Sequence, residues 1–283
     1  MRARGFTLVE LIVSMGLMGL AIAAIGSVLV TGLRTYSRQI ERAQVRANLR
    51  TAMATLTREL RGLDAGGRAG SDIAEMERSS ITYRATRSTY FLCVQPTPSE
   101  LTVTAWADPR ASLRQMEAGR DSVLLFAEND VTDPADNVWL SAGLNSVSTG
   151  AFCPEGKSGL RIAVSGVSES ELGGVFRGAV VRGFQMTKIL LYSDAQNQAW
   201  IGMRELRPGA GWTITQPILG PVAHGGLRFG YFGADGGAAK GPGTVARISI
   251  EVVGVGYLPV GAGAAPVRDS LTFHVGLRNN PDF

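Results

Sequence analysis

The longest apolar stretch of the chain lies at its N-terminus and restricts the structure there more than any other feature does. It runs for 28 residues, from Phe6 to Leu33, with Glu10 as its one charged side chain. A helix of this length measures about 42 Å at a rise of 1.5 Å per residue, whereas the hydrocarbon core of a bilayer is about 30 Å thick. The sequence therefore predicts a transmembrane helix over residues 6–33, with room for some tilt.

Basic residues stand on both sides of this stretch, with Arg2 and Arg4 before it and Arg34 and Arg38 after it. A cleaved secretory signal would have an apolar core of about 7–15 residues, followed by a cleavage site of small residues. This stretch is longer than that and continues into a helical pattern. The sequence thus favours an anchor that stays on the protein.

The charge of Glu10 suggests that the stretch has a function besides anchoring. A carboxylate within a membrane span costs about 2.5–3.5 kcal/mol on insertion scales, and such a charge is a functional hypothesis by default. Glu10 lies four residues after Phe6 on the same helical face, where it would meet an amine if the chain were cut before Phe6. The alternative is a plain anchor with Glu10 near the lipid headgroups.

The segment Gly5-Phe6-Thr7-Leu8-Val9-Glu10-Leu11 resembles the class III signal of type IV pilins and of the pseudopilins of type II secretion. The resemblance implies a leader of residues 1–5, cleavage between Gly5 and Phe6 by a prepilin peptidase, and N-methylation of Phe6. It also implies that Glu10 forms a salt bridge with a Phe6 amine during filament assembly.

The same resemblance implies partners and a location. The partners are the prepilin peptidase, other major and minor pilins or pseudopilins, and the assembly platform of the inner membrane. The subunit would be a single-pass protein of that membrane with its head outside the cytoplasm, and after assembly it would belong to a periplasmic or cell-surface filament.

The helical pattern continues beyond the membrane. From Leu49 to Leu63 the apolar residues follow in steps of four, three, four and three, which predicts one apolar stripe on a helix. Earlier members of the stripe are Ile40, Ala43 and Ala47. Residues 34–63 are therefore expected to be the amphipathic half of the same helix, which ends before Gly66 and Gly67. Charged residues form its expected solvated face: Arg38, Glu41, Arg42, Arg46, Arg50, Arg58, Glu59 and Arg61.

Residues 71–283 are expected to form a β-rich globular head, because the apolar pattern changes there from helical to alternating. Short strands separated by Gly- and Pro-rich turns, after one long helix, predict an α+β fold with an antiparallel sheet packed on the helix. The predicted strands are 81–84, 89–94, 101–106, 122–126, 159–164, 175–181, 185–192, 199–206, 227–232, 245–253 and 270–277.

One late segment adds to the resemblance. Residues Gly226 to Gly236, followed by the strand around Ile248, resemble the last hairpin of PilW-type minor pilins and of the J-type minor pseudopilin of type II secretion. In those families a strand with Phe and Tyr leads into an acidic-Gly turn and a second strand. Residues 71–217 resemble no family in particular.

Cys93 and Cys153 are the two cysteines of the chain. A disulfide is expected if the head lies outside the cytoplasm, and two buried free thiols are the alternative. Closing a loop of 60 residues stabilises a fold by about 4 kcal/mol in the chain-entropy model. No zinc site is expected, because His224 and His274 are far from both cysteines in sequence.

No catalytic motif, metal or cofactor site is predicted. Both histidines stand outside any known motif, and the Gly-rich segments near Gly254 and Gly261 lack a following helical pattern. The acidic run from Glu128 to Asn137, with Asp130, Asp133 and Asp136, has oxygen ligands suited to calcium but not the spacing of an EF-hand, so an exposed turn is favoured. The net charge is +4 with scattered arginines, which does not indicate a nucleic-acid partner.

These observations predict a non-enzymatic minor pilin-like subunit that assembles into, primes or caps a type IV pilus. One alternative is a minor pseudopilin of a type II secretion system. Another is a subunit at the filament tip that binds a surface or DNA, for which exposed tryptophans are candidates: Trp106, Trp139, Trp200 and Trp212.

Overall fold

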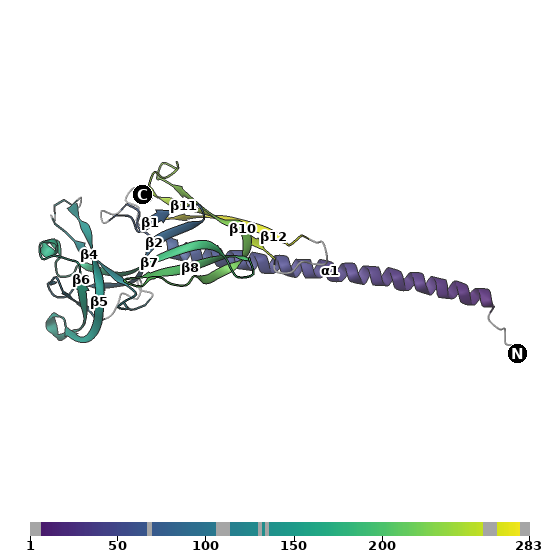
Figure 1. Cartoon of the computed structure of the whole chain (residues 1–283), viewed down its shortest axis with the longest axis horizontal. Coiled ribbons are helices and arrows are strands. Elements are labelled where there is room, and N and C mark those ends of the chain that lie inside the picture. The colour runs from purple at the N-terminus through teal and green to yellow at the C-terminus, as the bar shows by residue number, and fades with distance from the viewer. Residues whose placement is uncertain are drawn as a thin grey trace.

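The computed structural model describes residues 7–66, 70–105, 114–129, 132–133, 136–256 and 265–277. A single long helix projects from a β-rich head, with the N-terminus at one end of the molecule and strands β4, β5 and β6 at the other (Figure 1). The prediction of an α+β fold, with a long N-terminal helix and an antiparallel sheet, is confirmed.

Helix α1 runs without interruption over Leu8–Leu60, a length of 53 residues. No proline precedes Pro96, so every backbone N–H inside the helix can donate to the preceding turn. The helix ends three residues before the predicted Leu63, at a C-cap on Arg61 whose N–H donates to the Thr57 carbonyl. Gly62 follows at once, and the chain turns there towards the head.

The strands of the head are β1 (Ile73–Met76), β2 (Ser80–Phe91), β3 (Glu100–Thr104), β4 (Ser122–Ala127), β5 (Val138–Phe152), β6 (Ser158–Ser165), β7 (Val180–Ser193), β8 (Ala199–Arg207), β9 (Gly211–Trp212), β10 (Gln216–Phe232), β11 (Arg247–Val255) and β12 (Arg268–Gly276). Short 3-10 helices in the described ranges are η2 (Pro154–Gly156), η3 (Glu171–Gly174) and η4 (Pro242–Thr244).

All pairings in the sheet are antiparallel, and the strand order is β12-β11-β10-β8-β7-β4-β5-β6-β3. Strand β2 pairs with the other edge of β7 from Ser80–Leu190 to Phe91–Val180 and also holds β1. The β7–β8 hairpin turns at Asp194–Gln198, between the predicted strands 185–192 and 199–206. Strands β2 and β7 are long enough to run through the whole head.

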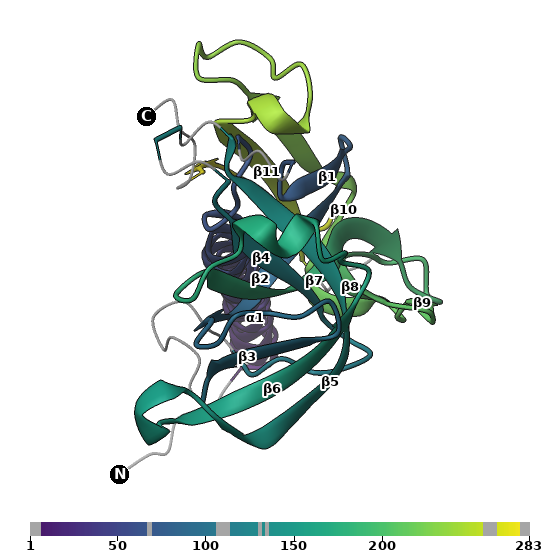
Figure 2. The same cartoon turned by 90° about the vertical axis from the view of Figure 1, so that its left-hand side faces the viewer.

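The head has two hydrophobic cores, which divide it into two lobes. The proximal lobe contains α1, β1, β8, β10, β11, β12 and the adjoining halves of β2 and β7, with Leu60, Tyr83 and Ile250 in its core. The distal lobe contains β3, β4, β5, β6 and the other ends of β2 and β7, with Leu101, Leu125 and Ile162 in its core. Figure 2 shows the distal lobe in front and α1 nearly end-on behind it.

The helix packs on β10, β11 and β12 through a narrow stripe of its second half. The buried residues of this stripe are Glu41, Val45, Leu49, Ala52, Leu56 and Leu60. They follow at intervals of three or four residues, which keeps them on one face of a helix with 3.6 residues per turn. This stripe is the contact that fixes the direction of the helix relative to the head.

The predicted stripe is right in its later part, where Leu49, Leu56, Leu60 and Leu63 are buried. It is wrong for Ile40 and Met53, which are exposed, and for Ala43 and Ala47, which are exposed as well. Glu41, placed on the solvated face by its charge, is buried against β11. The prediction placed the stripe by hydrophobicity alone. In the structure the head covers one face of the helix, whether the side chains on that face are apolar or charged.

The strand prediction misses β1, β5, β9 and the first part of β10, and it divides both β2 and β7 into two. Strand β5 is rich in Ser, Gly and Asn, and one of its faces is largely exposed, so its alternation of apolar residues is weak. In β2 the residues that separate the predicted strands 81–84 and 89–94 include Arg87 and Ser88, which are polar and yet buried. The last predicted hairpin is present as β10–β11, with Asp235 and Gly236 in its turn.

The close approach of α1 to β11 depends on Gly254. A Cβ atom at Gly254 would lie 2.9 Å from Val45 Cγ1 and 3.4 Å from the Leu49 side chain. Replacing Gly254 with valine should push the helix from the sheet and lower the free energy of unfolding by about 1–3 kcal/mol. Thermal unfolding of the full chain in detergent would measure this.

The matched control is Gly276→Val on the neighbouring strand β12, where a Cβ would have no atom within 4 Å. This variant should unfold at nearly the wild-type temperature. Equal loss of stability in both variants would contradict a role for Gly254 in helix packing.

Candidate assembly site

Glu10 lies at the N-terminal end of α1 and forms a capping box with Thr7. The Thr7 amide donates to Glu10 Oε2 at 3.0 Å, the Thr7 hydroxyl donates to the same atom at 2.9 Å, and the Glu10 amide donates to Thr7 Oγ1 at 3.3 Å. The box satisfies N–H groups that the first turn of a helix leaves free. It also holds the carboxylate against the backbone amide that directly follows Phe6.

The capping role of Thr7 was not predicted, although the Thr-x-x-Glu spacing is the sequence sign of a capping box. Gly5 and Phe6, the predicted cleavage and methylation sites, lie outside the described residues, as does the rest of the predicted leader. The role of Glu10 in a salt bridge with a Phe6 amine stays a prediction. Its position at the end of the helix is compatible with such a contact.

The first half of α1 has no partner within the described chain. An 18-residue window of the helix has a mean hydropathy of 2.3, and none of that window is buried. Its large side chains stand in the open, for example Leu8 with 77% and Val28 with 72% of its surface exposed. Fully burying a side chain of this kind is worth about 1.5–3 kcal/mol, so the helix needs lipid or other protein around it. One helix of this length and composition is enough to cross a membrane.

A buried ion pair joins the other end of α1 to the sheet. Arg87 Nη1 on β2 lies 3.1 Å from Glu59 Oε2, and both side chains are more than nine-tenths buried. The Tyr83 hydroxyl donates to the same carboxylate oxygen at 3.2 Å. Burial, and then the charge of Glu59, raises the pKa of Tyr83 well above its ordinary value, so this hydroxyl stays a donor. Sequence analysis placed Glu59 on the solvated face, and that prediction is wrong.

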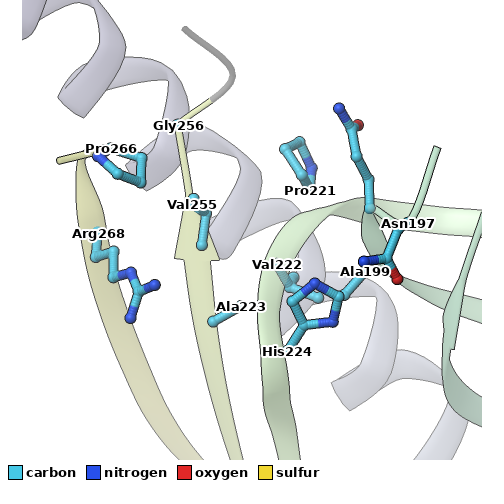
Figure 3. A pocket seen from close by; sticks show the side chains of 11 residues that line it. Asn197, Ala199, Pro221, Val222, Ala223, His224, Val255, Gly256, Pro266 and Arg268 are labelled. Carbon is cyan, nitrogen blue, oxygen red and sulfur yellow. The ribbon is translucent and has the colours of Figure 1, made fainter. Parts of the chain in front are cut away.

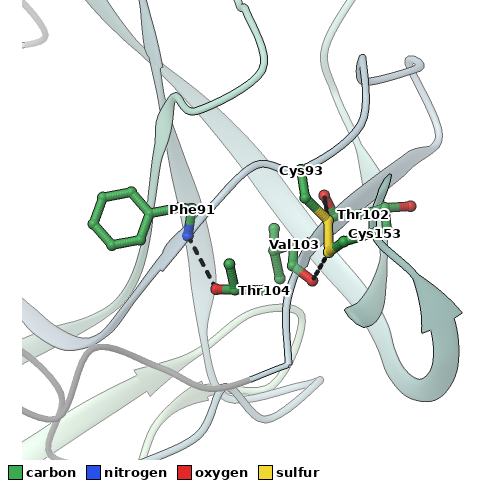
Figure 4. The surroundings of a disulfide bond; sticks show 6 residues. All are labelled: Phe91, Cys93, Thr102, Val103, Thr104 and Cys153. Carbon is green, nitrogen blue, oxygen red and sulfur yellow. Dashed lines mark hydrogen bonds between the residues drawn. A yellow bond between two sulfur atoms is a disulfide. The ribbon is translucent and has the colours of Figure 1, made fainter. Parts of the chain in front are cut away.

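The predicted disulfide between Cys93 and Cys153 is present, with an S–S distance of 2.01 Å. It ties the segment after β2 to the segment after β5, at the edge of the distal lobe (Figure 4). Both cysteines are buried, and Cys153 Sγ lies 3.7 Å from the Val103 carbonyl oxygen of β3. The bond therefore fastens the distal lobe, whose core, among the described residues, includes none from α1.

Two clefts lie at opposite ends of the head. One, of about 310 Å³, opens where β10 separates from β11, and His224 and Arg268 stand at its sides with α1 behind the strands (Figure 3). The other, of about 700 Å³, adjoins the disulfide of the distal lobe. Its walls are apolar at Leu92 and Pro154 and carry the cationic side chains of Lys157 and Arg177.

The other predicted candidates do not assemble into one site. In the described part of the chain no three His, Cys, Asp or Glu side chains gather as metal ligands, and Asp130 lies outside that part. His224 is exposed at the smaller cleft and His274 is exposed on β12. The tryptophans stand on three strands: Trp139 beside Arg182, Trp200 with Nε1 donating to Asp194, and Trp212 beside Arg204. Trp106 is outside the described residues.

Comparison with known proteins bears on the N-terminus. Residues 1–33 match the family model described as the prokaryotic N-terminal methylation motif. A motif of this kind indicates a type IV pilin-like precursor. The match supports the pilin and pseudopilin class, and it indicates processing by prepilin peptidase. No curated protein and no solved structure matches the chain.

The motif and the helix agree with each other. The match covers the apolar stretch and ends where the arginine-bearing part of α1 begins. An unburied apolar helix that follows a prepilin motif fits anchoring in a membrane and later assembly into a filament.

The ion pair between Glu59 and Arg87 predicts a large effect of one substitution. Arg87→Met would leave the Glu59 carboxylate buried without its counter-charge, so the free energy of unfolding should fall by about 3–5 kcal/mol. Denaturant unfolding of the full chain in detergent would measure it. The surface pair of Arg228 and Glu251, 4.0 Å apart, supplies the control, because Arg228→Met should cost less than about 1 kcal/mol. Similar losses in the two variants would contradict a structural role for the buried pair.

Proposed function

We propose that the chain is a minor pilin-like structural subunit, processed by prepilin peptidase and assembled into a type IV pilus, which it joins, primes or caps. The observation that carries the proposal is the continuity of α1. A methylation motif leads directly into a helix of 53 residues whose first half has no partner among the described residues of its chain, while its second half is fixed to a head.

In this proposal the two halves of the helix act differently. The apolar half lies in the inner membrane before assembly and among the helices of other pilins afterwards, with the head outside the cytoplasm. The Glu10 carboxylate, costly in an apolar environment, is neutralised by the Phe6 amine of a subunit in the filament. The role is structural and non-enzymatic, and its partners are the peptidase, other pilins and the inner-membrane assembly platform.

The same fold would serve a type II secretion system, where the chain would be a minor pseudopilin. Neighbouring genes separate the two machines, because a pilus operon includes a retraction ATPase and a secretion operon includes a secretin and an exported protein. The length of the head, which exceeds that of a minimal pseudopilin domain, favours the pilus.

A second function is favoured by the distal lobe. This lobe has a core of its own, a disulfide, and a cleft of about 700 Å³ with Lys157 and Arg177, and it lies farthest from the N-terminus. A cleft of this size, apolar with a few charged groups, suits a ligand. A subunit at the filament tip would present it outwards. The tryptophans add nothing to this proposal, because they are spread over three strands.

The substitution Glu10→Gln tests the assembly role. Glutamine can keep the hydrogen bonds to Thr7 but has no charge, so the variant should be processed and inserted normally. Without the carboxylate, the amount of the variant in filaments should be at least about tenfold lower. The reason is that the loss of one buried charge pair costs more than about 1.4 kcal/mol in the free energy of assembly. Quantitative immunoblots of sheared filaments and membranes would measure this.

Thr7→Val is the matched control, because it removes the cap and keeps the charge. It should enter filaments in amounts near those of the wild type. Wild-type incorporation of Glu10→Gln, or equal failure of both variants, would remove the Glu10 charge from its proposed role.

A further inference from the structure

A row of five arginines runs along α1 just beyond its apolar half. Arg34, Arg38, Arg42, Arg46 and Arg50 follow at intervals of four residues, and all five are exposed. Each lies about 40° further round the helix than the one before, and the row extends for about 24 Å along the axis. We call these residues the arginine row.

The chain neutralises little of this charge itself. Arg46 Nε lies 2.8 Å from Asp269 Oδ2 on β12, and Arg42 acts on the same carboxylate from a greater distance. Arg34, Arg38 and Arg50 have no ion-pair partner within the described ranges of the chain. The row therefore presents a positive surface to whatever lies beside the helix.

A second copy of this chain is a poor match for that surface. Over residues 34–60 the helix has two acidic residues, Glu41 and Glu59. Glu41 has 5% of its surface exposed, and Glu59 is buried in its pair with Arg87. Two copies with parallel helices would place arginines against arginines, and like charges repel.

Lipid headgroups account for only the start of the row. With residues 6–33 in the membrane, the headgroup layer extends about 5–8 Å beyond the hydrocarbon core. This reaches Arg34 and Arg38. Arg42, Arg46 and Arg50 lie about 12, 18 and 24 Å further along the axis than Arg34, beyond the headgroups and beyond most of their screened field.

We propose that the part of the arginine row beyond the headgroups, Arg42, Arg46 and Arg50, docks the helix of a different membrane-anchored subunit, one that carries Asp or Glu at intervals of three or four residues along about 12 Å. These three arginines lie within about 80° of one another around the helix, so one neighbouring helix can face all of them. A neighbour anchored in the same membrane or filament has its helix parallel to α1, so a row of acids along that helix can meet the arginines. Charge complementarity of this kind selects the partner and its register. The inference rests on the proposed function and adds to it: the neighbours of this subunit are acidic and are not copies of itself.

Photo-crosslinking in cells that carry the native genes tests the proposal. A photoreactive residue at Gln39 lies about 60° from Arg42 around the helix, whereas one at Gln44 lies about 160° away. Both glutamines are exposed, so Gln44 is the matched control. The Gln39 product should contain a peptide of another membrane-anchored chain with acidic residues at the stated spacing. The Gln44 product should lack that peptide.

Charge reversal completes the test. Arg42→Glu with Arg50→Glu leaves the pair of Arg46 and Asp269 in place and should lower the crosslink at Gln39 about tenfold, since like charges replace opposite ones. Arg58→Glu, an exposed arginine about 160° round the helix from Arg42, should leave it unchanged. Arginines introduced at the acids of the partner should restore the crosslink.

A crosslink to a second copy, a lipid adduct alone, a partner segment without acids, no product at Gln39, or an unchanged yield after charge reversal would each overturn the proposal. An intact leader on the wild-type chain would instead count against the proposed function, so the two failures are distinguishable.

Discussion

The structure depends on one constraint, which is an apolar helix half that its own chain does not cover. The side chains from Leu8 to Leu33 are almost all exposed, and burying each large one is worth about 1.5–3 kcal/mol. The head is too far along the helix to provide that burial, because its contact begins at Glu41. The missing partner must therefore come from a membrane or from other subunits. The N-terminal methylation motif is compatible with a membrane before assembly and with other subunits after it.

The second half of α1 packs on the head and fixes the orientation of the helix relative to it. Apolar contacts from Val45 to Leu60 lie on β10, β11 and β12, and the pair of Glu59 and Arg87 joins the end of the helix to β2. Because β2 and β7 run on into the distal lobe, the position of the helix also sets where that lobe lies. A subunit of this form can thus carry a fixed orientation from a filament core to the far end of its head.

The sequence predicts the helix well, because 28 residues with one charge allow few other structures. It predicts the disulfide because the chain has two cysteines, in a head that is expected to lie outside the cytoplasm. It fails where polar residues are buried by long-range contacts. Glu41 and Glu59 are predicted to face solvent because the segments that cover them lie far away in sequence. Strand β5 is missed because its exposed face weakens the alternation of apolar residues. The capping box of Thr7 and Glu10 is local, and its Thr-x-x-Glu spacing could have been noticed.

The central claim is that the chain enters the filament pathway through a processed N-terminus. The most direct test is the intact mass of the N-terminal peptide from cells that carry the native gene. The account predicts a peptide that begins at Phe6 with one added methyl group on its amine. A peptide that begins at Met1, or at another cut, would contradict it, and Glu10 would then be an incidental charge in a plain anchor.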